Sequence, residues 1–151
     1  GPGQHLPPSH PPVIPYMLRQ SVRGGTIIVH GSGNQTRDYV FVDDVVNAMV
    51  AASTAPNINN LVINIGSGVE TSVRDLVSIV QQAAGNQAEV VYNPRMDPGV
   101  SRMCADLRLA ADKLSYQPRI AIPEGLRLTM QRDTRLRKDA TRPIRQSSTE
   151  V

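Results

Sequence analysis

The sequence has 151 residues, of which 40% are hydrophobic and only 3% aromatic, enough for one domain, or part of one, with a core of Val, Ile, Leu and Ala. A single cysteine, Cys104, excludes an internal disulfide, and no signal peptide or apolar run of roughly 20 residues is present, so we expect a cytoplasmic protein without a membrane anchor. Six cations and three anions from Gln131 onward account for the whole net charge of +3, and this tail lacks the aromatic residues typical of a nucleic-acid surface.

The first part of the chain predicts a loop, a helix and two strands. Residues 1–12 are too rich in Pro and Gly for a helix or a central strand and are typical of a loop inside a domain. Residues 13–23 have helical periodicity, and two glycines follow them. The β-branched residues 26–30 predict a strand, residues 31–36 a polar loop, and residues 39–42 a second strand.

Helices and strands alternate in the rest of the chain, which indicates an α/β architecture. Asp43 and Asp44 favour a helix start, and Ser72 and Asp106 are predicted helix caps. The run 61–65 is apolar throughout, as in a strand buried on both faces. The expected elements are a helix over 45–53, a strand over 61–65, a helix from Ser72 to Gly85, a strand over 88–92, a helix ending at Leu114 and a helix from Pro123 to about Met130.

The loop between the first two predicted strands is a candidate ligand site. Its glycines let a ligand approach the backbone, and Arg37, where the loop rejoins the strand, has a planar fork that can hold two phosphate oxygens. The same arginine could instead pair only with Asp38 or Asp43. Gly31-Ser-Gly33 and Gly66-Ser-Gly68 each lack the third glycine of a dinucleotide fingerprint.

A second group of cations lies in the loop that contains Arg95 and Arg102, ahead of a predicted helix. These arginines could hold a pyrophosphate together with Arg37. They could equally be ordinary surface charges.

Three stretches in serial order carry a resemblance: GSGNQTRDYVFVD over 31–43, NIGSG over 64–68 and SRMCAD over 101–106. From Gly1 to about Met130 the chain resembles the extended short-chain dehydrogenase/reductase family, the NAD-dependent epimerases and dehydratases typified by UDP-glucose 4-epimerase. The resemblance implies an α/β fold that forms the C-terminal, substrate-binding portion of an extended Rossmann-type protein, with one or two elements that normally belong to the NAD-binding sheet. Residues 131–151 would be a basic polar tail, partly helical at its start and disordered over 139–151.

The resemblance also implies a substrate site. Arg37 would hold the diphosphate of a nucleoside-diphosphate sugar, and an arginine of the second loop would join it. Because Asp97-Pro-Gly99 shifts the family's pattern in that loop, either Arg95 or Arg102 could be the phosphate contact. The other implied contacts line the substrate cleft (Ile14, Pro15 and Tyr16) or flank the nucleobase (Val29 and His30).

The family's catalytic and cofactor residues are not found in the sequence. No tyrosine is followed four positions later by lysine, so the Tyr-x-x-x-Lys pair is missing, as is the Gly-rich phosphate loop. We therefore expect no catalytic, NAD-binding or metal-binding residue in this chain. The parent protein would use NAD to oxidise a ring hydroxyl, at C4 of the sugar, before epimerisation or dehydration.

The expected partners are a nucleoside-diphosphate sugar and the N-terminal NAD-binding half, with a possible homodimer in the parent, and neither nucleic acid nor membrane. In the family the helix after Asp43 and the strand 61–65 pack against the cofactor domain, so we expect their apolar faces to be exposed here and the chain to be marginally stable or self-associating. One alternative is a non-catalytic sugar-nucleotide-binding module or truncated gene product. Another is an adaptor for nucleic acid or an acidic partner that works through the basic tail.

Overall fold

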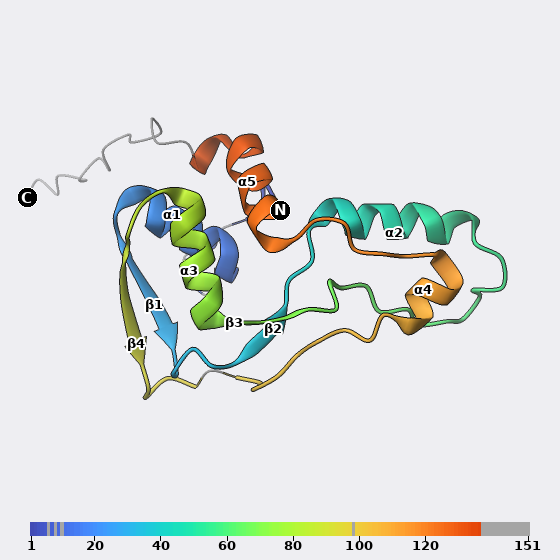
Figure 1. Cartoon of the computed structure of the whole chain (residues 1–151), viewed down its shortest axis with the longest axis horizontal. Coiled ribbons are helices and arrows are strands. Elements are labelled where there is room, and N and C mark those ends of the chain that lie inside the picture. Colours follow the sequence, from blue (N-terminus) through green and yellow to red (C-terminus); the bar gives the residue numbers. More distant parts are fainter. Residues whose placement is uncertain (6, 8, 10, 98, 137–151) are drawn as a thin grey trace, which may run out of the picture.

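The computed structural model describes residues 1–5, 7, 9, 11–97 and 99–136, which form two lobes joined by extended segments (Figure 1). The larger lobe contains α1 (Val13–Arg23), β1 (Thr26–His30), α3 (Val73–Ala84), β4 (Glu89–Asn93), α5 (Ile122–Arg132) and the short 3₁₀ helix η1 (Thr134–Leu136). The smaller lobe contains α2 (Val42–Thr54) and α4 (Arg108–Leu114), and the short strands β2 (Thr36–Asp38) and β3 (Glu70–Ser72) run between the lobes.

The larger lobe is a two-stranded parallel sheet covered by helices. Strands β1 and β4 pair in parallel, with Thr26 opposite Glu89. Gly24 ends α1 in the left-handed conformation, at φ 66°, where its N–H donates to the last carbonyls of the helix. Ser72 begins α3, because its hydroxyl accepts the N–H of Asp75. These predicted helix ends are confirmed, as is the strand over 26–30.

Two hydrophobic clusters stabilise the fold. The larger cluster joins α1, β1, α3 and α5, and its most buried side chains include Leu18, Ile27, Leu76 and Val80. The smaller cluster contains Ala48 of α2, Ala110 of α4 and Tyr116, whose hydroxyl donates to the carbonyl of Gly66 at 2.7 Å. The α/β fold class inferred from the sequence is therefore confirmed.

Two predicted strands are wrong. The strand expected over 39–42 lies earlier in the chain, as β2 at Thr36–Asp38, because these are the residues that pair with antiparallel β3. Helix α2 already begins at Val42. Residues 61–65 form no strand, since no strand in the described ranges lies beside them and a ladder needs a partner for its backbone groups. Val62 is 88% exposed, so this run is not buried on both faces.

A third difference concerns the start of α4. This helix begins at Arg108 after Leu107, which makes no capping hydrogen bond through its side chain. The carboxylate of Asp106 accepts the N–H of Arg108 at 3.0 Å, one residue before the cap position. Asp106 thus satisfies a helix-end donor without being the N-cap residue that we expected.

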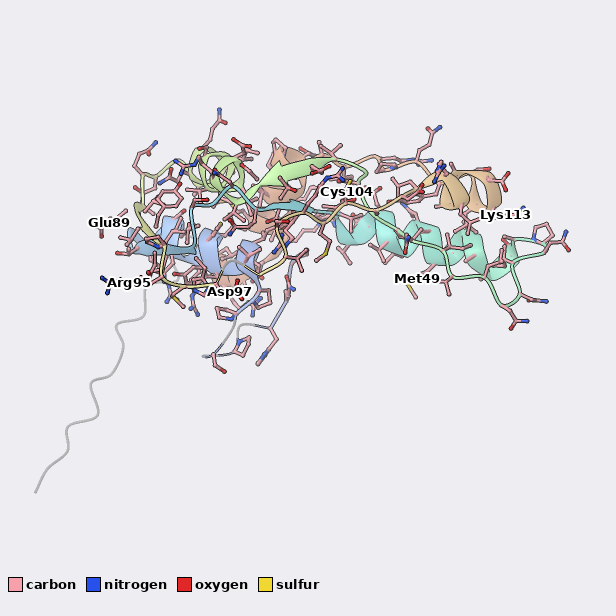
Figure 2. All side chains as sticks on the ribbon, turned by 90° about the horizontal axis from the view of Figure 1, so that it is seen from below. Met49, Glu89, Arg95, Asp97, Cys104 and Lys113 are labelled. Atoms are coloured by element: carbon pink, nitrogen blue, oxygen red, sulfur yellow. The ribbon has the colours of Figure 1, made fainter. Side chains whose placement is uncertain are left out.

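The outer side of α2 exposes apolar side chains in a stripe. Val46, Met49 and Val50 recur at the spacing of one helical face and are 49%, 67% and 63% exposed, while Ala48 faces α4. Met49 projects from the side of α2 away from α4 (Figure 2). The expectation that this helix leaves an apolar face uncovered is therefore confirmed.

We expect the chain to self-associate at micromolar concentration through this stripe, because exposed apolar patches of this kind favour association. Val50→Lys should shift the sedimentation-velocity distribution toward the monomer. Gln82→Lys adds the same charge at an exposed position of α3 and should leave the distribution unchanged. A single monomeric species of the unaltered chain with a sharp cooperative melt would contradict this expectation.

No helix within the described ranges is both long and apolar enough to cross a membrane. The chain is described as far as η1, and the disorder predicted over 139–151 lies outside the described residues.

Candidate functional site

A pocket of about 640 Å³ lies between α1, β1 and the start of β2. Helix α1 contributes Val13, Tyr16, Met17 and Arg19, and β1 contributes its last three residues, Ile28, Val29 and His30. Strand β2 and its flanking residues contribute Gln35, Arg37 and Tyr39. The rest of the described lining consists of Pro11, Val73 and Met96. The described lining thus contains two arginines and no carboxylate, so this pocket favours an anionic ligand.

Arg37 enters the pocket from β2 and is held in place by main-chain oxygens. Its Nη1 donates to the carbonyls of Thr36 at 2.7 Å and Val100 at 2.5 Å. Gly99 lies against the same guanidinium, since a Cβ on this glycine would be 3.7 Å from Nη2 of Arg37. The segment after β4 therefore fixes the direction of the arginine.

The carboxylates that could have paired with Arg37 have other partners. Asp38 accepts hydrogen bonds from Ser67 N–H at 2.6 Å, Ser67 Oγ at 2.6 Å, Gly68 N–H at 2.9 Å and Ala105 N–H at 3.1 Å. Burial raises the pKa of Asp38, but these hydrogen bonds outweigh it and hold the pKa below its ordinary value. Asp43 accepts from Nη1 of Arg132 at 2.8 Å.

Arg102 lies on the opposite side of β2 from Arg37. The residues before and after Arg102 form backbone hydrogen bonds with Thr36. Thr36 N–H donates to Ser101 O, and Met103 N–H donates to Thr36 O. Glu70 joins the two side chains: it accepts from Thr36 Oγ1 at 2.9 Å and from Nε of Arg102 at 2.7 Å. Because successive side chains of a strand point to opposite faces, Thr36 and Arg102 lie on one face and Arg37 on the other.

Arg95 is exposed in the segment after β4 and is absent from the pocket lining (Figure 2). The structure therefore brings Arg37 into the pocket and leaves Arg95 and Arg102 outside its lining. The three predicted phosphate contacts do not converge in this conformation.

The three residues predicted to line the cleft lie in three different places. Tyr16 lines the pocket, and its hydroxyl accepts from Ile28 N–H at 3.1 Å and donates to Thr26 O at 3.3 Å. Pro15 is buried in α1, and Ile14 lines a separate small cavity beside Phe41.

Both predicted nucleobase contacts lie in the pocket lining. The side chain of Val29 is buried, and His30 is exposed at the end of β1. The carbonyl of His30 accepts from Nε2 of Gln35 at 3.0 Å.

Three polar lining residues, Arg19, Gln35 and Tyr39, were missed from the sequence. Arg19 follows Tyr16 by three positions, a spacing that places both on one side of a helix and could have identified it. Gln35 and Tyr39 flank Arg37, and alternation along the strand was the available signal for Tyr39. The buried hydroxyl of Tyr39 has no hydrogen-bond partner among the described residues, and burial raises its pKa despite the opposing charge of Arg37.

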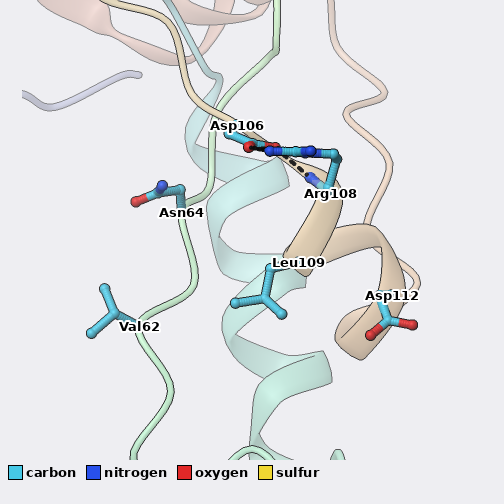
Figure 3. A pocket seen from close by; sticks show the side chains of 6 residues that line it. All are labelled: Val62, Asn64, Asp106, Arg108, Leu109 and Asp112. Carbon is cyan, nitrogen blue, oxygen red and sulfur yellow. Dashed lines mark hydrogen bonds and ion pairs between the residues drawn. The ribbon is translucent and has the colours of Figure 1, made fainter.

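A second, open pocket of about 520 Å³ lies between α4 and the segment 61–65 (Figure 3). Two of its three charged lining residues pair with each other, because Nε of Arg108 donates to both carboxylate oxygens of Asp106 at 3.0 Å. This pairing lowers the pKa of Asp106 to about 2. Among the described residues no group of His, Cys, Asp or Glu could hold a metal ion.

Residues 1–66 match the sequence model of the NAD dependent epimerase/dehydratase family. The chain is 36% identical to a UDP-glucose 4-epimerase of Mycolicibacterium smegmatis over 79% of its own length and 38% of the relative's. It is 29% identical to a UDP-glucuronic acid decarboxylase 1 of Xenopus tropicalis over 86% of its length and 30% of that protein.

Solved structures give the same result. A UDP-glucose 4-epimerase of Thermotoga maritima, crystallised with UDP-glucose, superposes with a TM-score of 0.79 and 34% identity over 87% of this chain and 41% of that one. MoeE5 in complex with UDP-glucuronic acid and NAD superposes with a TM-score of 0.77 and 30% identity over 87% and 42%. The chain thus spans about two fifths of these structures and corresponds to their C-terminal portion.

Proposed function

The chain belongs to the NAD-dependent epimerase/dehydratase family and corresponds to a part of its members, and from this we propose a function. We propose that the chain is the sugar-nucleotide-binding portion of an enzyme that acts on a nucleoside-diphosphate sugar. The observation that carries the proposal is the pocket beside α1 and β1, which combines Arg37 with a described lining free of carboxylates. A diphosphate supplies the anionic oxygens that a planar guanidinium pairs with best.

The end of β1 supports a nucleobase beside the diphosphate. In a parallel strand the N–H and C=O groups of one residue point to one edge, and those of the next residue point to the other edge. In β1 these groups of residues 26, 28 and 30 point away from β4. The N–H of His30 and the carbonyl of Ile28 belong to this edge, and both residues line the pocket. A pyrimidine imide has the complementary acceptor and donor, and Val29 and His30 would flank its ring.

The described residues do not fit NAD as a whole ligand. The turn Gly66–Gly68 is the nearest counterpart of a phosphate-binding loop, but the carboxylate of Asp38 already accepts the N–H groups of Ser67 and Gly68. We therefore assign no NAD contact to this chain. In the proposed parent reaction, NAD would supply the hydride acceptor for oxidation at C4 of the sugar before epimerisation or dehydration, and the pocket with Arg37 would bind and orient the nucleotide.

We expect the chain to bind UDP-glucose without added NAD and to catalyse no epimerisation, because its sequence has no Tyr-x-x-x-Lys pair to move the proton. Isothermal titration calorimetry measures the binding, and chromatography of the sugar nucleotides with and without NAD measures turnover. Binding without turnover supports the proposal. The same result is also expected of the alternative, a non-catalytic sugar-nucleotide-binding module. Failure to bind UDP-, dTDP- or GDP-sugars would remove the proposal, and turnover by the chain alone would contradict the assignment of catalysis to residues outside it.

A further inference from the structure

Arg19 is a pocket residue of α1 that has no partner among the residues that the structure describes. It makes no hydrogen bond, ion pair or ring contact with any residue over the described ranges. Five other arginines pair with carboxylates: Arg102, Arg108, Arg127, Arg132 and Arg135. The half-buried position of Arg19 is therefore not explained by an internal ion pair.

The pocket gives Arg19 a common environment with Arg37. The two arginines belong to α1 and β2, and they border the same cavity from different elements. Because no described lining residue is acidic, none of them can serve as a counter-ion for Arg19, and an anionic ligand in the pocket can take that role. A cavity of about 640 Å³ is within the size range of small-molecule sites, so a ligand can reach both cations.

We propose that Arg19 is a second cationic contact of this pocket and binds an anionic group of the sugar nucleotide, an inference that rests on the proposed function. The group is a phosphate or a sugar carboxylate, since a guanidinium pairs with the oxygens of either. Arg37 and Arg19 together then determine which anionic ligands the pocket accepts.

The test compares Arg19→Gln with Arg23→Gln in the same chain. Arg23 is on the same helix, exposed and outside the pocket lining, so its replacement removes the same charge without touching the site. Calorimetry measures the dissociation constants of UDP-glucose and UDP-glucuronic acid, and thermal melts confirm that both variants fold. Arg19→Gln should weaken binding about five- to twentyfold, in line with the loss of one partly exposed charge-assisted hydrogen bond, and Arg23→Gln less than twofold.

The two ligands identify the anion. Equal losses for both ligands assign Arg19 to phosphate, whereas a loss for UDP-glucuronic acid alone assigns it to the sugar carboxylate. Changes in the dissociation constant below twofold for both ligands, or equal losses of affinity in the two variants, overturn the inference. The proposed function still stands in that case if the unaltered chain binds the ligands. If the unaltered chain binds neither ligand, both the inference and the proposed function fail.

Discussion

Arg37→Ala is expected to weaken the binding of UDP-glucose to the chain about tenfold to a hundredfold, because it removes charge-assisted hydrogen bonds that contribute roughly 1.5–3 kcal/mol each. Arg37→Lys keeps the positive charge but loses the planar fork, so its affinity should lie between those of alanine and arginine. Calorimetric titration of the three proteins with UDP-glucose measures the series.

The control must separate ligand binding from folding, since Nη1 of Arg37 also donates to the carbonyls of Thr36 and Val100. Arg119→Ala removes an exposed arginine outside the pocket lining and should leave both the affinity and the melting temperature near those of the unaltered chain. A loss of affinity in Arg37→Ala at a nearly unchanged melting temperature supports a ligand contact. A large fall in melting temperature, with alanine and lysine equally impaired, would make Arg37 a structural residue and remove the main support for the site.

Asp38→Ala is expected to lower the free energy of unfolding by about 2–4 kcal/mol, because it leaves the N–H groups of Ser67, Gly68 and Ala105 without their acceptor. These bonds join β2 to the turn before β3 and to the segment before α4, so their loss separates the pieces that hold Arg37. A domain is stable by only about 5–15 kcal/mol, so the effect is large. Urea denaturation followed by circular dichroism measures it.

The pH dependence of Asp38 has a definite sign. Its pKa is lower in the folded chain than the ordinary value of 3.8, so the ionised carboxylate stabilises the fold above that value. This contribution is lost as the pH falls through the lowered pKa. The difference in unfolding free energy between the unaltered chain and Asp38→Asn should therefore be largest near neutral pH and shrink below about pH 3.8.

Asp112→Ala is the matched control for Asp38, because Asp112 is exposed and pairs only with its neighbour Lys113 among the described residues. Its removal should change stability by less than about 0.5 kcal/mol. Equal losses of unfolding free energy in Asp38→Ala and Asp112→Ala would contradict the role assigned to the Asp38 carboxylate. So would a difference in unfolding free energy between the unaltered chain and Asp38→Asn that does not depend on pH.

The helices of the larger lobe could be predicted because their signals are local. The periodicity of α1 and its glycine stop lie within a dozen residues, and Ser72 and the inward residues of α3 lie within one helix. A helix satisfies most of its backbone hydrogen bonds internally, so short-range sequence is enough to place it. The strand β1 was also found, since its β-branched residues have a partner in β4.

The same local signals failed where the partner was distant or lacking. Residues 61–65 have the composition of a buried strand, yet no described strand pairs with them, and Val62 is the clearest sign of their exposure. The antiparallel pairing of β2 with β3, more than 30 residues later, shifted the second strand to Thr36–Asp38. Strand pairing is a property of two segments, and a single segment does not contain it.

For the candidate site, the sequence by itself determined that Arg37 follows a glycine-containing loop at the start of a strand and that the chain resembles the epimerase/dehydratase family. Only the tertiary structure decided which cations share a pocket with Arg37. It turned Arg102 to the opposite face of β2, left Arg95 exposed and brought Arg19 from α1 into the lining. The physical reason is that the direction of a side chain depends on the register of its strand or the rotation of its helix, and both are set by packing against segments far away in the chain.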